Sequence, residues 1–281
     1  MEEKTKLLPI TNDYIFKRVF SYEGNEDVLK DLLEAILEIK INKVEVKNPE
    51  IIGDTIGSKK GVLDIKAELD DGTLIDVEMQ AGNEKNIEER STTYVGELIA
   101  GELQAGEKYI ELKKVIFIGI LNFNYYQRNS YHSIAKMKFE KTKEKERVDM
   151  GYKKEEEIAS KYMEMHFIEI PKFMKKKTDK EDKLTQWLWL FSGEGEKMKM
   201  AEKKNKKVEK AIKTLEKISM DPKEREIQRA IELGEFFQRI RETKAKEEEK
   251  VEIAKRMKEK GMEIQLIKEM TGLTEEEIKK L

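Results

Sequence analysis

Residues 61–80, GVLDIKAELDDGTLIDVEMQ, form two runs of alternating apolar and polar residues on either side of an Asp-Asp-Gly turn. An alternation with a period of two is typical of a β-strand that has one apolar and one polar side. The turn between the two runs indicates that they pair as a β-hairpin. This hairpin constrains the fold more than any other segment, because its apolar side has to be covered by other parts of the chain.

The alternation also predicts the register of the hairpin. A two-residue loop would place apolar residues opposite polar ones, whereas a three-residue loop over residues 70–72 keeps one side apolar. That loop requires a type I turn followed by Gly72 in the left-handed conformation, where glycine is least strained. The predicted pairs are Leu63–Met79, Ile65–Val77 and Ala67–Ile75.

The polar side of the predicted hairpin carries a candidate metal site. Asp64 lies directly opposite Glu78, with their Cβ atoms roughly 5 Å apart, and Gln80 is on the same side. Two like charges at this distance are unfavourable unless a cation bridges them or one carboxyl takes a proton. Carboxylate oxygens suit Mg²⁺, with Mn²⁺ as a possible substitute. Such an ion can polarise a phosphodiester and activate a bound water, and the amide of Gln80 can orient that water or a phosphate oxygen.

The other segments predict an α/β protein of helices and strands, with an all-α C-terminal extension. Residues 115–123, VIFIGILNF, are almost continuously apolar, which is typical of a central strand covered on both sides. Toward the C-terminus the pattern becomes helical and rich in Lys and Glu, so we expect one region over residues 1–195 and another over residues 196–281. Further strands are expected at 43–46, 62–69, 74–79 and 166–170, and helices at 11–39, 87–103 and 184–191.

Charge and composition limit the classes of protein to consider. The 56 basic and 58 acidic residues give a net charge of -2, so contact with DNA has to come from local basic patches. Because cysteine is absent, disulfides, thiolate zinc sites and cysteine nucleophiles are excluded, and two histidines are too few for a multi-histidine metal centre. No apolar run reaches the ~20 residues of a membrane span. The N-terminus lacks the apolar segment of a signal peptide, so the expected location is the cytoplasm.

The spacing Asp-x13-Glu-x-Gln, from Asp64 to Gln80, resembles the PD-(D/E)XK nuclease motif with Gln in place of the usual Lys. More specifically, the chain resembles the recombination-promoting nuclease (Rpn)/transposase family of that superfamily. The resemblance implies a restriction-endonuclease-like core in which helices flank a mixed central β-sheet. It also implies Mg²⁺-dependent DNA cleavage and a role in recombination or mobile elements. The other matching segments are Asn12-Asp13, Phe16-Lys17, Arg90, Tyr94, residues 115–123, residues 166–173, residues 187–191 and the final TGLTEEEIKKL.

Two departures from the family pattern leave alternatives open. Val-Leu stands at residues 62–63 where the family name has Pro, and Gln80 replaces the Lys, which leaves cleavage rate and metal stoichiometry open. The main hypothesis is a DNA endonuclease of low sequence specificity, in which Asp64 and Glu78 hold the metal, Gln80 positions water or phosphate, and Asp13 assists. One alternative is a degenerate nuclease fold that binds DNA without cutting it. The other is a protein-interaction module in which the hairpin is only structural.

Several further residues are candidates with an ordinary structural interpretation beside the functional one. Asp13 occupies a first helical turn, where acidic residues are common because of the helix dipole. Lys17 can contact a DNA phosphate, but a solvated lysine on an amphipathic helix is the simpler interpretation. Arg90 and Tyr94 are one helical turn apart and can either contact DNA or buttress the sheet.

Clusters of basic residues are the remaining candidates for DNA contact. They occur at residues 172–177, 203–207 and 136–147, although a charge run is usually a solvated helix face. Within the first cluster we single out Lys175, Lys176 and Lys177.

The C-terminal region ends in a helix-turn-helix-like element. Residues 262–270 and 275–281 are expected to be helical, with Gly272 as a C-cap and Thr274 as an N-cap. Three glutamates, at residues 275–277, argue against insertion of the last helix into a DNA groove, which favours a helical cap or self-association element. We therefore expect DNA as a partner of the nuclease region and a homodimer formed through the C-terminal helices.

Overall fold

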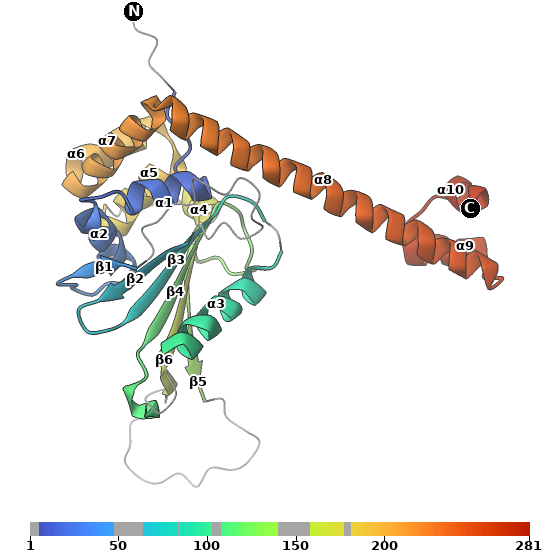
Figure 1. Cartoon of the computed structure of the whole chain (residues 1–281), viewed down its shortest axis with the longest axis horizontal. Helices are drawn as coiled ribbons and strands as arrows, with labels where there is room; N and C mark the ends of the chain where they lie inside the picture. Colours follow the sequence, from blue (N-terminus) through green and yellow to red (C-terminus); the bar gives the residue numbers. More distant parts are fainter. Residues whose placement is uncertain (1–5, 48–63, 84, 103–107, 140–157, 177–180) are drawn as a thin grey trace, which may run out of the picture. The chain divides into compact units, whose positions relative to one another are not determined.

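The computed structural model describes residues 6–47, 64–83, 85–102, 108–139, 158–176 and 181–281. It divides the chain into two compact units, Met1–Arg225 and Glu226–Leu281 (Figure 1). Within the described part, no helix is long and apolar enough to cross a membrane.

The first unit is built on a mixed six-stranded sheet in the order β1-β2-β3-β4-β6-β5. β3 and β6 run parallel to β4, while the other neighbouring pairs are antiparallel. Helices flank this sheet, as the sequence predicts (Figure 1). The strands are β1 (Val44–Val46), β2 (Ile65–Leu69), β3 (Leu74–Gln80), β4 (Val115–Leu121), β5 (His132–Lys138) and β6 (Ile158–Glu169).

The hairpin of β2 and β3 has the predicted register. Gly72 has a φ of 81°, and its N–H donates to the carbonyl oxygen of Leu69 at 3.0 Å, which closes a three-residue loop. The predicted partner of Met79, Leu63, lies outside the described residues. The confirmed pairs are Ile65–Val77 and Ala67–Ile75.

β4 is the central strand that the apolar run predicts, and every one of its residues is buried. One side of the sheet is covered by α3 (Ile87–Glu102), whose Val95 packs in one core cluster with Phe117 of β4 and Phe167 of β6 (Figure 1). Toward the β1 edge of the sheet, α1 (Asp13–Phe20) lies beside β3, and α2 (Glu26–Leu37) lies beside β1.

The position of α1 is fixed by aromatic packing and by a buried carboxylate. Phe20 lies 5.5 Å from Trp187 of α5 (Lys183–Ser192), measured between ring centroids. At the start of α8 (Pro222–Glu259), Glu224 accepts a hydrogen bond from the hydroxyl of Tyr14 at 2.6 Å and forms an ion pair with Arg18. α1 is therefore held at both its apolar and its polar side. The remaining helices of this unit are α4 (Ile170–Lys175), α6 (Gly195–Lys204) and α7 (Lys206–Met220).

The second unit ends in the predicted pair of short helices, α9 (Ile264–Thr271) and α10 (Glu275–Lys280). Gly272 ends α9 with a φ of 74°, and Thr274 begins α10 with a capping box that includes Glu277. Ile267 and Ile278 pack together with Met257 of α8 in a small apolar core. This core joins the end of α8 to the two helices.

One whole strand, β5, is missing from the sequence prediction. It is an edge strand in which Ile134, Ala135, Lys136 and Met137 are all exposed, so it lacks an apolar side. β6 also begins well before the predicted residue 166. It ends at Glu169 because Pro171 lies in the first turn of α4.

A buried hydrogen-bonded chain links β5 to β6. His132 Nε2 lies 2.9 Å from His166 Nδ1, and His166 Nε2 lies 2.9 Å from Glu164 Oε1. Burial, and then the neighbouring His166, lower the pKa of His132 to about 4. Burial alone would raise the pKa of Glu164, but its bonds to Lys114 and His166 outweigh burial and lower it to about 2. These contacts stabilise the folded state while His132 is neutral and Glu164 is ionised, as both are at neutral pH.

We predict that His132→Asn flattens the acid destabilisation of the protein. The unfolded chain protonates His132 near its ordinary pKa of 6.5, whereas the folded chain does so only near 4, so stability falls as the pH drops across this window. In the variant, the slope of the unfolding free energy against pH should be smaller by about 1.4 kcal/mol per pH unit, which corresponds to one bound proton. Urea unfolding between pH 7 and pH 4.5 measures the slope, and equal slopes in the two proteins would contradict the prediction.

Candidate active site

The polar side of the hairpin is buried, not solvated. Asp64 is 6% exposed, Asp76 is fully buried, and Glu78 and Gln80 are each 4% exposed. These side chains are therefore not ordinary solvent-facing carboxylates and amides of a surface hairpin. α3 covers this side, because the guanidinium of Arg90 on α3 forms an ion pair with Glu78.

Asp76 is a site residue that the sequence analysis did not select. Its period-two spacing from Glu78 was the available signal, because it puts both residues on one side of β3. Among the described residues, neither of its carboxylate oxygens accepts a hydrogen bond from a donor. Burial, and then the charge and contact of Asp64, raise the pKa of Asp76 well above its usual range. Asp64 and Asp76 thus form an acidic pair in which the charge of Asp64 disfavours the ionisation of Asp76.

Glu78 has one oxygen held by donors and one that is not. Oε1 receives hydrogen bonds from Arg90 and, at 3.4 Å, from Nε2 of Gln80. Oε2 is buried and accepts no hydrogen bond from a described residue. Burial raises the pKa of Glu78, although Arg90 and Gln80 act in the opposite direction. The arrangement orients the carboxylate and leaves Oε2 available to a ligand.

Arg90 contacts residues of the protein itself at this site, namely Glu78 and Tyr94. Its Nη2 also lies 3.2 Å from the hydroxyl of Tyr94, which is packed against the core at the centre of the sheet. Tyr94 therefore buttresses Arg90, which in turn holds Glu78. The predicted contact of Arg90 with DNA stays a prediction.

Asp13 lies where α1 meets the end of β3. Its Oδ1 accepts a hydrogen bond from the backbone N–H of Ala81 at 3.1 Å, directly after Gln80. Asn12 caps the helix by accepting from the N–H of Ile15 at 3.2 Å. Asp13 thus fastens the start of α1 beside the site.

Lys17 is the largest difference from the sequence expectation. It is only 2% exposed, so the interpretation as a solvated lysine is wrong. Burial lowers the pKa of Lys17, while the charges of Asp64 and Asp76 raise it and that of Lys66 lowers it. Its position one turn after Asp13 was the available signal, since the two share one side of α1. α1 therefore brings a buried ammonium group to the acidic pair.

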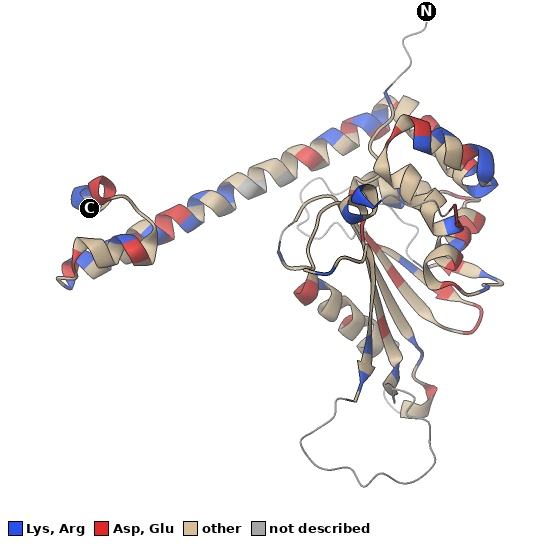
Figure 2. Cartoon of the chain, turned by 180° about the vertical axis from the view of Figure 1, so that it is seen from behind, with Lys and Arg blue, Asp and Glu red and all other residues tan. Residues whose placement is uncertain are grey.

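Several lysines of the basic clusters have partners within the chain, among the residues that the structure describes, and residues 140–147 of the third cluster lie outside them. In the first cluster, Lys172 donates to the carbonyl oxygen of Tyr126 at 2.6 Å and pairs with Glu169. Figure 2 shows basic and acidic residues interleaved along the helices. In the cluster at residues 203–207, two lysines form ion pairs with acidic residues elsewhere in the unit, namely Lys204 with Glu181 and Lys207 with Asp27.

The three selected lysines of the first cluster have different surroundings. Lys175 is exposed on α4. Lys176 lies over the ring of Tyr131, 5.4 Å from its centroid. Lys177 lies outside the described residues. Their contact with DNA stays a prediction.

The donor set of the hairpin fits a hard divalent cation. Asp64, Asp76 and Glu78 supply only carboxylate oxygens, and a cation would relieve the repulsion that raises the pKa of Asp76. Among the described residues, no three His, Asp or Glu side chains already surround a common ion position. One or two carboxylates with several waters are sufficient for Mg²⁺, which keeps part of its hydration shell in most protein sites.

A mixed sheet flanked by helices, with buried carboxylates on a hairpin, fits the restriction-endonuclease-like fold. Residues 10–233 match the model described as PD-(D/E)XK nuclease family transposase, and the chain belongs to this family. Residues 247–281 match the model described as Rpn/YhgA-like nuclease family, C-terminal HTH domain. Searches of curated proteins and of solved structures found no match. The second match favours a DNA-binding helix-turn-helix over the simple helical cap preferred from residues 275–277.

We predict that Asp76→Asn stabilises the metal-free protein and weakens its response to metal. The substitution removes a buried charge that Asp64 disfavours, so in EDTA at pH 8 the Tm should rise by roughly 2–4 °C, the shift that about 1 kcal/mol gives a domain of this size. Mg²⁺ should raise the Tm of the wild type more than that of the variant. Thermal unfolding with and without Mg²⁺ measures both effects. A lower Tm of the variant in EDTA would show that the charged pair is not repulsive.

Proposed function

We propose that the protein is a Mg²⁺-dependent DNA endonuclease of low sequence specificity. The observation that carries the proposal is the burial of Asp64, Asp76 and Glu78 on one side of the hairpin together with the ammonium group of Lys17. Burying these charges is unfavourable unless a ligand or reaction uses them. The family match to a nuclease supports this interpretation.

In this proposal Asp64 and Glu78 hold the metal, and Asp76 contributes a further carboxylate beside Asp64. Bound there, Mg²⁺ would polarise the scissile phosphate and lower the pKa of a coordinated water. The contact with Arg90 fixes Oε1 of Glu78, so the buried Oε2 is the oxygen that would hold the ion.

Lys17 takes over the task of the lysine that the hairpin lacks. In relatives with the usual motif that lysine follows the glutamate by two residues, where this chain has Gln80. The ammonium group of Lys17 donates hydrogen bonds to a phosphate oxygen and offsets the negative charge that develops during cleavage. Gln80 positions the attacking water, and Asp13 keeps α1, and with it Lys17, in place.

The region over residues 196–281 is assigned a supporting role in the proposal, beside a nuclease region over residues 1–195. Its helix-turn-helix would bring the enzyme to DNA, and the family description links the protein to transposase-related or recombination processes. In the described part of the hairpin site there is no element that reads base edges, which agrees with weak sequence preference.

Cleavage of supercoiled plasmid tests the proposal. We expect nicking with Mg²⁺ or Mn²⁺, none with EDTA, and loss of detectable nicking in Asp64→Asn and Glu78→Gln. Lys17→Met should slow cleavage by roughly 100-fold, whereas Lys17→Arg should keep part of the activity, because one charge-donating group contributes about that factor.

Lys43→Met is the matched control, because Lys43 is an exposed lysine directly before the edge strand β1 and should not affect nicking. DNA binding without nicking in any metal would favour the degenerate, DNA-binding alternative that Gln80 suggests. Nicking that survives Asp64→Asn and Glu78→Gln would refute the assigned site.

A homodimer through the C-terminal helices is the second part of the proposal. Four large apolar residues of α8 repeat at spacings of three, four and seven residues, so they form one stripe on the helix. Each is about half exposed, which is unusual for a stripe of this length in a monomer. The residues are Leu233, Phe236, Phe237 and Ile240, with 54%, 54%, 51% and 46% exposure.

We predict that Phe237→Glu converts the dimer to a monomer. A central aromatic residue of an interface commonly contributes at least about 2 kcal/mol, so the dimer Kd should rise at least about 30-fold. Sedimentation equilibrium at micromolar concentration measures the mass. Met220→Glu, at an exposed apolar residue at the end of α7, is the control and should stay dimeric. A wild type that is monomeric at about 50 µM, above the Kd expected of a specific dimer, would refute the dimer.

A further inference from the structure

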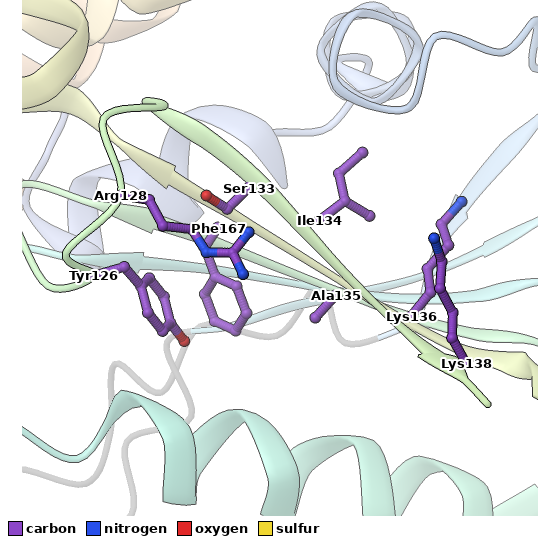
Figure 3. A pocket seen from close by; sticks show the side chains of 8 residues that line it. All are labelled: Tyr126, Arg128, Ser133, Ile134, Ala135, Lys136, Lys138 and Phe167. Atoms are coloured by element: carbon purple, nitrogen blue, oxygen red, sulfur yellow. The ribbon is translucent and has the colours of Figure 1, made fainter. Parts of the chain in front are cut away.

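An open pocket of about 670 Å³ lies at the edge strand β5, and we call it the β5-edge pocket (Figure 3). Its walls combine two aromatic residues, Tyr126 and Phe167, with three cations, Arg128, Lys136 and Lys138. Among the described residues no Asp or Glu lines it, although the chain has 58 acidic residues. Its volume is in the range of pockets that hold a small molecule or a nucleotide.

The pocket and the acidic hairpin lie on one row of the sheet. Glu78 pairs with Gly119 of β4, Gly119 pairs with Phe167 of β6, and Phe167 pairs with Ser133 of β5. With about 4.8 Å between neighbouring strands, Ser133 lies roughly 14 Å from Glu78 across the sheet. Phe167 packs in the same core cluster as Val95 of α3, so it is on the same side of the sheet as the acidic site.

A line of aromatic rings connects the two places. The ring of Tyr94, whose hydroxyl contacts Arg90, lies 6.5 Å from the ring of Phe117. Phe117 lies 5.9 Å from Phe167, which lies 5.1 Å from Tyr126 at the pocket. Gly119 leaves room for this line, because a Cβ there would come within 3.0 Å of Phe117. The sheet thus offers an apolar path from the acidic hairpin to a cationic pocket.

Protection of the edge strand from pairing with another chain explains only some of the residues that line the pocket. Lysines on an edge strand discourage pairing with another chain, and Lys136 also forms an ion pair with Glu164 at 3.3 Å. Arg128 and Tyr126, however, come from the segment before β5 and are not edge-strand residues. In Figure 3 the side chain of Arg128 lies beside the rings of Phe167 and Tyr126. A cation beside aromatic rings is the combination that binds a nucleotide.

We propose that the β5-edge pocket binds a single-stranded segment of the DNA substrate that adjoins the scissile phosphate, an inference that rests on the proposed function. A base stacks on Tyr126, while Arg128, beside the rings, contacts a phosphate (Figure 3). The separation of roughly 14 Å corresponds to about four nucleotides at the 3.4 Å rise of a stacked strand. Because stacking and phosphate contacts do not read sequence, the pocket selects frayed, gapped or single-stranded DNA without a base preference.

The test measures binding of a fluorescein-labelled 12-nucleotide oligo-dT by fluorescence anisotropy in EDTA, with the full-length protein. Arg128→Glu should weaken binding about tenfold and lower the slope of log K against log salt by about one. Tyr126→Leu should weaken binding at least about fivefold without changing that slope. Lys43→Glu, directly before the opposite edge strand β1, is the matched control and should bind as the wild type does.

Each outcome has a defined meaning, because the assay needs neither metal nor cleavage. Weaker binding in Arg128→Glu and Tyr126→Leu, with unchanged Tm, supports the pocket even if plasmid nicking fails. Wild-type affinity in Arg128→Glu, or an equal loss in Lys43→Glu, overturns it even if nicking succeeds. A 12-base-pair duplex run in parallel should respond less to Tyr126→Leu than oligo-dT does, and an equal response would overturn the preference for single strands.

Discussion

The repulsion between buried carboxylates on the hairpin is the interaction on which the other features of the site depend. Asp64, directly before β2, lies close to Asp76 of β3, in a place where burial and the charge of Asp64 disfavour the ionisation of Asp76. A chain selected only for stability would avoid this arrangement, because apolar side chains at these positions would complete the core. The protein retains the acidic pair and surrounds it with groups that offset its charge.

Those offsetting groups come from two different helices. Arg90 reaches Glu78 from α3, and Lys17 reaches the acidic pair from α1. Each helix is fastened by an independent contact, Tyr94 for the guanidinium and Asp13 for the start of α1. The ion pair of Glu224 with Arg18 adds a second hold on α1 from the beginning of α8. The fold therefore positions the charges before any ligand is present.

Much of this could be predicted from the sequence because strand alternation and turn chemistry are local. The register of the hairpin followed from Gly72 and from the two alternations, and the central strand followed from its continuous apolar run. β5 could not be predicted, because an edge strand with exposed residues on both sides has no local pattern. The helix-turn-helix was visible in outline from Gly272 and Thr274, but its three glutamates favoured another interpretation.

The burial of Lys17 could not be predicted either, for a different reason. An isolated amphipathic helix gives a lysine no reason to be buried, and the cause is two carboxylates some fifty residues further along the chain. Asp76 was overlooked because a single carboxylate on a polar strand side has no distinguishing context until the sheet is assembled. Both residues depend on tertiary packing, which outweighs local preference at functional sites.

The most direct test of the account is an anomalous diffraction map of crystals grown with Mn²⁺. We predict a peak bordered by the carboxylates of Asp64, Asp76 and Glu78, with Lys17 turned toward the space beside it. The same crystals of Asp64→Asn should show a much weaker peak. A map without a peak at the hairpin, or with Mn²⁺ bound only at other carboxylates, would contradict the central claim that this buried acidic side is a metal-dependent catalytic centre.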